Sequence, residues 1–401
     1  MALNISVFLF AVALFTSKSL ITLMTVILIL WSIIAKSQRQ LWLKNNKAVL
    51  IVALFPLALI ASLFSLGGWQ SALTVVKSWP WPLLAAPAVC IYHNKILTDF
   101  FKKGLLLGLV LAVGCSLVKL VLALNSEITA PFMSDNFRIA SFWDISRWGF
   151  FSGIAVLILF FTWHQLSLRK HKMLFGALLI FTAISFALTN TRATAVAALA
   201  GLVFFAATDR RMIKTLLVGI AAASLFIFLT PKFQQRVQSI FAVNIADGKI
   251  SSEHASNAGR FTMWKVALDF FQEQPIFGTG FENTKQPLKN FLEVKGSKYL
   301  ENYPMAEFSY NDQHSSYISM LVQMGALYFV IFWGLIFYWL AMAFRKYWQR
   351  PDKTTQLLLA GLIYCGLIFI FYSSLNSFEA IAFFIMLVLL GESQFMKSTS
   401  S

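Results

Sequence analysis

Charged residues are scarce in this chain of 401 residues. Only 12% of the residues are charged, whereas 58% are hydrophobic and the mean hydropathy is +0.70. Soluble domains carry about 25% charged residues, so a water-soluble fold of this length is excluded. Apolar runs of about 15–25 residues recur instead, the length at which a helix crosses about 30 Å of hydrocarbon. We therefore predict an all-α, polytopic integral membrane protein.

Cysteine pairs, metal-binding motifs and nucleotide-binding loops are missing as well. The three cysteines, Cys90, Cys115 and Cys365, all fall inside or at the edge of apolar runs. Neither a disulfide framework nor a thiolate metal site is therefore predicted. There is no Asp-x-Asp, no His-x-x-x-His and no Walker loop. We expect no metal, no cofactor and no ATP-driven step in this chain.

The basic residues, which give a net charge of +16, alternate with the apolar runs. Seventeen Lys and Arg residues lie in five segments, at 36–47, 93–103, 164–172, 209–214 and 345–353. The short connections between these segments hold only five. Because basic loops of membrane proteins face the cytoplasm, this charge indicates topology, and no nucleic-acid partner is predicted.

Twelve apolar segments are predicted to span the membrane, at 2–16, 19–35, 48–66, 79–92, 104–124, 148–163, 173–189, 193–207, 212–229, 316–344, 356–373 and 376–391. The first is short for a span and the fourth contains three prolines, but the charge alternation needs both. No Lys or Arg precedes Lys18, so the first segment is expected to be retained rather than cleaved as a signal peptide. Residues 1–229 then form helices 1–9, residues 230–315 one large periplasmic loop, and residues 316–401 helices 10–12 with a short cytoplasmic tail.

The 230–315 loop is predicted to carry short amphipathic helices. It holds nine basic and nine acidic residues, so its net charge is zero. Phe261, Trp264, Leu268 and Phe271 recur at helical spacing, and Pro275 ends the pattern. We expect this helix to lie on the membrane surface or against the bundle; a simple lid over the bundle fits the spacing equally.

The ionisable residues at the ends of the predicted spans all lie on the loop side: Lys119, Arg147, Arg192, Arg260, His314 and Glu379. A coupled transporter would place such residues near the bilayer midplane. A site at one face instead suits a substrate with a lipid tail in the membrane and a polar head outside. Snorkelling to lipid headgroups is the alternative for Lys119, Arg147 and Arg192. Glu379 is expected to pair with a cation, and Arg138 is expected at the surface.

His314 is the candidate general base. Asp312 is expected to cap the helix that begins near it, which would place the imidazole in the first turn. The positive end of the helix dipole disfavours imidazolium, and a neutral imidazole is what a base for a sugar hydroxyl requires. An interfacial histidine bonded to the backbone is the alternative. The arginines match phosphate oxygens by their bidentate geometry.

Three motifs resemble the O-antigen ligase and O-antigen polymerase family of bacterial envelope enzymes. They are the turn Thr189-Asn190-Thr191-Arg192, the run Gly259-Arg260 with Trp264 and Pro275-Ile276-Phe277-Gly278-Thr279-Gly280, and His314-Ser315-Ser316-Tyr317 followed by Gly325. Together they cover about residues 190–325, and the helix layout with one large external loop agrees with them.

The resemblance implies metal-independent transfer of a glycan from undecaprenyl pyrophosphate at the periplasmic face of the bacterial inner membrane. In the ligase branch the acceptor is a sugar hydroxyl of lipid A–core, so the product belongs to lipopolysaccharide. Carried over to this sequence, His314 is the base, and Arg260 and Arg192 hold the pyrophosphate. Position adds Arg147 and Lys119 to the substrate-binding residues. Membrane lipids are the remaining expected partners, and the oligomeric state is not predicted.

The compact loop and the length near 400 residues favour the ligase branch. A polysaccharide polymerase of the same family, which often has two larger external loops, stays open. So does a protein O-oligosaccharyltransferase, although members of that branch are usually longer. From another class, a membrane transporter or lipid flippase stays open, and the near-absence of midplane charges argues against it.

Overall fold

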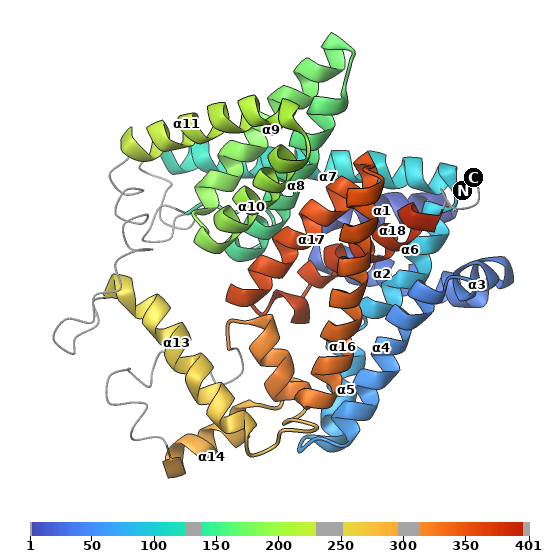
Figure 1. Ribbon diagram of the computed structural model, residues 1–401, viewed down its shortest axis with the longest axis vertical. Coiled ribbons are helices and arrows are strands. Elements are labelled where there is room, and N and C mark those ends of the chain that lie inside the picture. Colours follow the sequence, from blue (N-terminus) through green and yellow to red (C-terminus); the bar gives the residue numbers. More distant parts are fainter. Residues whose placement is uncertain (1, 125–137, 230–251, 296–312, 396–401) are drawn as a thin grey trace.

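The computed structural model describes residues 2–124, 138–229, 252–295 and 313–395 (Figure 1). Within these ranges the regular elements are all helical, which confirms the all-α prediction there. They are α1 (Ala2–Thr16), α2 (Lys18–Ile34), α3 (Lys36–Leu43), α4 (Asn46–Leu63), α5 (Gly68–Ser78), η1 (Trp81–Leu84), α6 (Ala85–Tyr92), α7 (Lys95–Leu124), α8 (Ile145–Gln165), α9 (Arg169–Thr189), α10 (Arg192–Thr208), η2 (Arg210–Met212), α11 (Ile213–Leu229), α13 (Ser252–Phe271), α14 (Lys285–Lys295), α16 (Ser316–Gln349), α17 (Lys353–Phe371), η4 (Ser374–Asn376) and α18 (Glu379–Phe395).

Six helices in the described ranges are long and apolar enough to cross a membrane: α4, α7, α8, α9, α16 and α17. The pair α2 and α3, bent by 88°, makes a seventh candidate, and α1, α10 and α18 include shorter apolar stretches. The chain is therefore a multi-pass membrane protein, whereas the number of twelve spans stays a prediction. The proline-containing fourth segment is interrupted, since the 3-10 helix η1 precedes the eight-residue α6. Proline has no N–H for the helical ladder, which explains the break.

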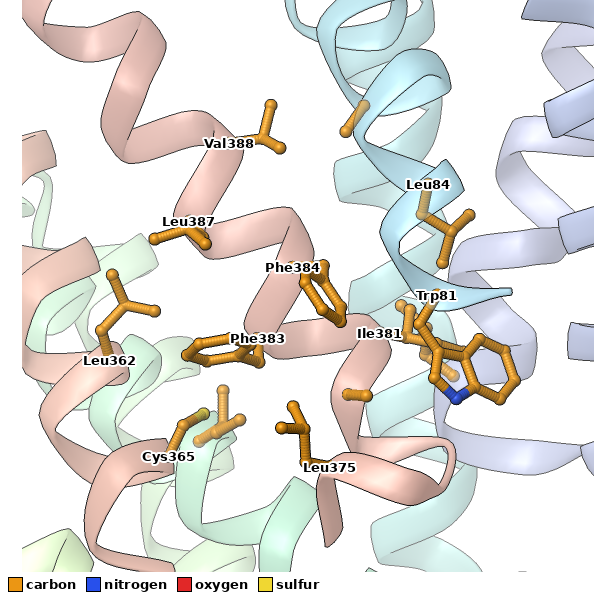
Figure 2. Close-up of a cluster of buried hydrophobic side chains, with 14 of the residues drawn as sticks. Trp81, Leu84, Leu362, Cys365, Leu375, Ile381, Phe383, Phe384, Leu387 and Val388 are labelled. Carbon is orange, nitrogen blue, oxygen red and sulfur yellow. The ribbon is translucent and has the colours of Figure 1, made fainter. Parts of the chain in front are cut away.

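Aromatic packing fixes the start of α18. Trp79 is fully buried, and four ring centroids, those of Phe281, Tyr328, Phe332 and Phe384, lie 5.8–6.3 Å from its own. Its indole nitrogen donates to the carbonyl oxygen of Leu375 at 3.3 Å. Figure 2 shows α18 between α17 and the 81–92 segment, with the rings of Phe383 and Phe384 filling the core. The connection from α17 to α18 is thereby held rigidly.

α16 is broken at Gly325, which has φ 75° and ψ 170°, and its two parts run in different directions (Figure 1). Residues 275–280, which we call the brace loop, supply partners for the main-chain groups that the break releases. Thr279 and Gly280 donate to the carbonyl oxygens of Val322 and Gln323 at 3.0 and 2.8 Å, and Ala326 donates to the carbonyl oxygen of Pro275 at 2.8 Å.

The brace loop also reaches the end of α4. The amide of Gly67 donates to the carbonyl oxygen of Thr279 at 3.0 Å. A methyl group on Gly278, which has φ 68°, would overlap the Val322 carbonyl oxygen, and one on Gly325 would overlap the carbonyl oxygen of Ile276. Gly278 and Gly325 therefore let two backbones approach closely, which is a structural role.

α13 begins earlier than the predicted helix and buries a different face. Its buried residues are Met263, Val266, Ala267 and Phe270, which pack with α14 and with Val322 of α16. Phe261 is 61% exposed and Leu268 is 43% exposed, whereas Phe271 packs against this cluster, so only part of the face expected from the spacing is covered. α14 and α16 cover the neighbouring stripe instead, and an apolar edge of α13 stays open.

Candidate active site

His314 precedes the helix that it was expected to join. α16 begins at Ser316, and its N-cap is Ser315, whose hydroxyl accepts from the amide of Ile318 at 3.5 Å. Asp312, the predicted cap, lies outside the described residues. His314 has φ 50° and sits before the cap, so the prediction that its imidazole lies in the first turn is wrong. A helix dipole acts mainly within that turn.

The start of α16 is bonded to the end of α17. The amide and the hydroxyl of Ser316 both donate to the carbonyl oxygen of Tyr372, at 3.1 and 2.8 Å. The hydroxyl of Ser315 donates to the carbonyl oxygen of Phe369 at 3.4 Å. These bonds hold the backbone of His314 close to Tyr372.

Arg260 reaches the same tyrosine from α13. The carbon of its guanidinium lies 5.6 Å from the centroid of the Tyr372 ring, within cation–π range. One helical turn later, the indole nitrogen of Trp264 donates to the carbonyl oxygen of Gln313 at 2.8 Å. α13 is therefore anchored to Gln313 and Tyr372, and Arg260 lies over the tyrosine whose carbonyl oxygen bonds to Ser316, two residues after His314.

The amide side chain of Gln313 is buried, with 1% exposure, and neither of its polar atoms has a hydrogen-bond partner within the part of the chain that the structure describes. An unsatisfied buried amide is destabilising, so the residue before His314 carries an energetic cost.

Arg192 opens α10 in a tightly fixed turn, as predicted. Asn190 ends α9 in the left-handed conformation, with φ 50°. The hydroxyls of Thr189 and Thr191 are 2.9 Å apart, and that of Thr191 also bonds to Thr194. All three threonines are buried, so the position of the Arg192 backbone is well determined.

Arg138 lies beside this turn, which corrects the expectation of a surface residue. Its Nε donates to the carbonyl oxygen of Thr189 at 2.9 Å, and the amide of Ile139 donates to that of Leu188 at 3.0 Å. Burial lowers the pKa of the Arg138 guanidinium; the nearby charge of Arg192 lowers this pKa further, and Tyr372 opposes the shift.

Arg147 forms ion pairs with two carboxylates of the protein. Its guanidinium is 2.7 Å from Asp144 and 3.7 Å from Glu379. Glu379 is buried and accepts from the hydroxyl of Ser377. The expectation that Glu379 pairs with one of the cations is confirmed.

Lys119 is bonded to the backbone. Its ammonium group donates to the carbonyl oxygen of Ser141 at 2.5 Å. The hydroxyl of Ser141 in turn donates to the carbonyl oxygen of Ala112 at 2.5 Å. Lys119 therefore ties α7 to the segment that leads from Arg138 to α8.

Around Tyr372 the fold places Arg260 by a cation–π contact and the backbone that follows His314 by hydrogen bonds, while Arg138 is bonded to the turn that precedes Arg192. Guanidinium groups suit phosphate oxygens, and an imidazole can accept a hydroxyl proton. Tyr372 escaped sequence reasoning because a tyrosine at the end of an apolar run is typical of any membrane interface. In the four described ranges, no three His, Cys, Asp or Glu side chains gather as a metal-binding group.

Comparison with known proteins adds one match. Residues 177–333 match the model of a protein family described as O-antigen ligase. The matched range begins in α9, ends in α16 and includes Arg192, Arg260, His314 and the brace loop. No curated protein matches the chain.

Proposed function

From the membership of this chain in the O-antigen ligase family, which the match supports, we propose that it is an O-antigen ligase. It moves a glycan from undecaprenyl pyrophosphate to a sugar hydroxyl of lipid A–core at the periplasmic face of the inner membrane. The observation that carries this proposal is the approach of Arg260 to Tyr372, whose carbonyl oxygen is bonded to Ser316, two residues after His314; Arg260 and His314 both lie inside the matched range.

In this proposal the arginines hold the donor. Arg260 and Arg192 bind the pyrophosphate oxygens through their planar forks, and they neutralise the charge that develops as the pyrophosphate leaves. A diphosphate leaving group already stores the free energy for transfer, so the step draws on no nucleotide.

His314 serves as the base. Its imidazole removes the proton of the acceptor hydroxyl while the hydroxyl oxygen attacks the anomeric carbon. The bond from that carbon to the pyrophosphate oxygen breaks, undecaprenyl pyrophosphate departs with the electron pair, and the configuration at the carbon inverts. The proton remains on His314 until solvent removes it.

Arg147 and Lys119 are less suited than Arg260 and Arg192 to bind the substrate directly. Arg147 already faces Asp144 and Glu379, and Lys119 already donates to a carbonyl oxygen. For either to bind a phosphate, one of these partners would have to be exchanged for the ligand. We therefore assign them to the wall of the site and leave direct contact with substrate as the sequence-based prediction.

The experiment that tests the function examines lipopolysaccharide from a strain that lacks this chain. A ligase is supported if the whole O-antigen ladder is lost, including the band with a single repeat. Loss of every band above one repeat would indicate a polymerase of the same family instead. An unchanged ladder would contradict both, and would favour the oligosaccharyltransferase or transporter alternatives.

A further inference from the structure

We propose that an anionic phospholipid binds in a groove between α4 and the second part of α16, residues 326–349, with an acyl chain in the groove and its phosphate on Arg345 and Lys47. The inference does not rest on the proposed glycan transfer. The groove has a volume of about 440 Å³, within the range of about 300–1,000 Å³ that is usual for small-molecule sites. Its lining is apolar and comes from these two helices, among them Leu50, Ala53, Leu57, Val330, Gly334 and Tyr338.

The groove begins where direct contact between the two helices ends. Near the break of α16 they lie side by side (Figure 1), and the hydroxyl of Ser62 donates to the sulfur of Met324 at 3.6 Å. The hydroxyl of Tyr328 donates to the carbonyl oxygen of Leu54 at 3.2 Å. Farther along, Gly334 has no side chain, and a methyl group there would meet nothing within 4 Å. Because packed helices leave few voids of this size, we expect an apolar chain from the membrane to fill the groove.

Basic residues lie at the end of the groove away from the break. Arg345 follows Tyr338 by seven residues, about two helical turns, so it lies on the groove face of α16. Lys47 precedes Leu50 by three residues and lies in the first turn of α4. Arg345 is exposed, and it forms no ion pair with a carboxylate in the part of the chain that the structure describes. The segments around these two residues hold seven Lys and Arg residues and no Asp or Glu: residues 36–47 and 345–351.

This charge distinguishes a phospholipid from a second copy of the chain. In a symmetric dimer the same patch of both copies meets itself, so contact through the groove would bring the Arg345 and Lys47 side chains of the two copies together. Like charges repel at such an interface. An anionic phospholipid instead places its phosphate among the basic residues and its chain along the apolar lining.

The position of the charge also argues against the polyprenyl tail of the proposed donor. α16 ends at Gln349 and α17 begins at Lys353, so Arg345 lies near the start of α17. Tyr372, with Arg260 over its ring, follows the opposite end of α17. A donor bound by its diphosphate beside Arg260 would therefore leave the basic end of the groove without an anion.

Native mass spectrometry of the purified full-length protein tests the proposal by titration with dioleoyl phosphatidylglycerol or with dioleoyl phosphatidylcholine, which has no net charge. We expect the wild-type protein to bind one phosphatidylglycerol about tenfold more tightly than phosphatidylcholine. Arg345→Gln and Lys47→Gln should each weaken phosphatidylglycerol binding about fivefold and leave phosphatidylcholine binding unchanged. Gly334→Leu, which fills the groove, should weaken the binding of both lipids. Arg39→Gln is the matched control, since Arg39 is an exposed cation of α3 outside the groove.

Four results would overturn the inference. Equal wild-type affinities for the two lipids would remove the role of the headgroup. A loss in Arg39→Gln as large as that in Arg345→Gln would indicate a diffuse basic surface instead of a site. A dimer that Gly334→Leu dissociates would assign the groove to a second copy, and displacement of phosphatidylglycerol by undecaprenyl phosphate would assign it to the donor tail. If Gly334→Leu does not fold, Arg345→Gln still decides, because that change leaves the groove intact.

Discussion

The side chain and the main chain of Tyr372 contact different parts of this site. Its ring lies under the guanidinium of Arg260, while its carbonyl oxygen receives two hydrogen bonds from Ser316, two residues after His314. The side chain therefore positions one proposed group and the main chain positions another. A substitution at Tyr372 would disturb the first and spare the second.

His314→Ala should abolish glycan transfer while the protein still inserts into the membrane. A general base contributes about 10²–10⁴-fold to a rate. The rate is measured with purified protein, a lipid-linked glycan and lipid A–core. His171→Ala, near the N-terminal end of α9, is the control. If His314→Ala retained transfer, His314 would not be the base.

Arg260→Lys should lower kcat/KM for the donor about tenfold or more, because an ammonium group cannot offer the planar two-nitrogen fork. Lysine keeps the charge, so loss of charge cannot account for the effect. Steady-state kinetics with varied donor measures it. Wild-type turnover in this variant would mean that Arg260 contributes only its positive charge and that its bidentate geometry is not needed.

Variants of the Arg147–Glu379 pair test whether Arg147 has a structural role or binds the substrate. Arg147→Met leaves Glu379 buried without its main cation, so we expect the unfolding free energy to fall by about 3 kcal/mol. The double variant Arg147→Met with Glu379→Met should recover most of this stability, as thermal unfolding in detergent will show.

The glycan-transfer activity of the same double variant is the second measurement. If Arg147 supports only the wall of the site, transfer should return with the stability. A double variant that is stable but inactive would instead place Arg147 on the substrate, as the sequence predicted.

Among the helices, the break in α16 depends on the brace loop. Gly278→Ala forces a side chain into a left-handed backbone position against the Val322 carbonyl, and strain of this kind costs about 1–3 kcal/mol before the clash is counted. We expect a lower unfolding temperature and reduced transfer, since the first part of α16 follows His314. Gly334→Ala, in a helical position with open space, should be neutral or slightly stabilising.

The elements also show where sequence reasoning reached its limit. The turn before Arg192 was predictable because its short polar residues lie between two apolar runs. The buried stripe of α13 was not, because α14 and Val322 determine which face packs. The pairing of Gly278 with Gly325 joins residues far apart in the chain, and local spacing carries no signal for such contacts.

For the whole molecule, composition was sufficient to predict a helical membrane protein, and charge alternation led to a topology that can be tested. Arg138 was misjudged because it sits in a polar connection without periodicity, where nothing in the sequence indicates burial. The meeting of α13, Tyr372 and the start of α16 joins segments that are far apart in the chain, so it required the tertiary structure.

A cysteine at Phe142 should react with an impermeant maleimide added to intact cells, whereas one at Ser37 should react only after lysis. Both positions are exposed; the first lies in a segment predicted to be periplasmic and the second in a basic cytoplasmic loop. Cys90 and Cys365 are buried and Cys115 lies within α7, which keeps the background low. Equal labelling before lysis would contradict the topology.

The spread of the site along the chain has a consequence for biosynthesis. Tyr372, which Arg260 contacts and to which Ser316 is bonded, comes later in the chain than Arg138, Arg192, Arg260 and His314. A nascent chain leaving the ribosome thus carries its arginines into the membrane long before the tyrosine that organises them exists. We therefore predict that products that stop before Tyr372 are inert, and that transfer begins only after the chain has been made beyond this residue.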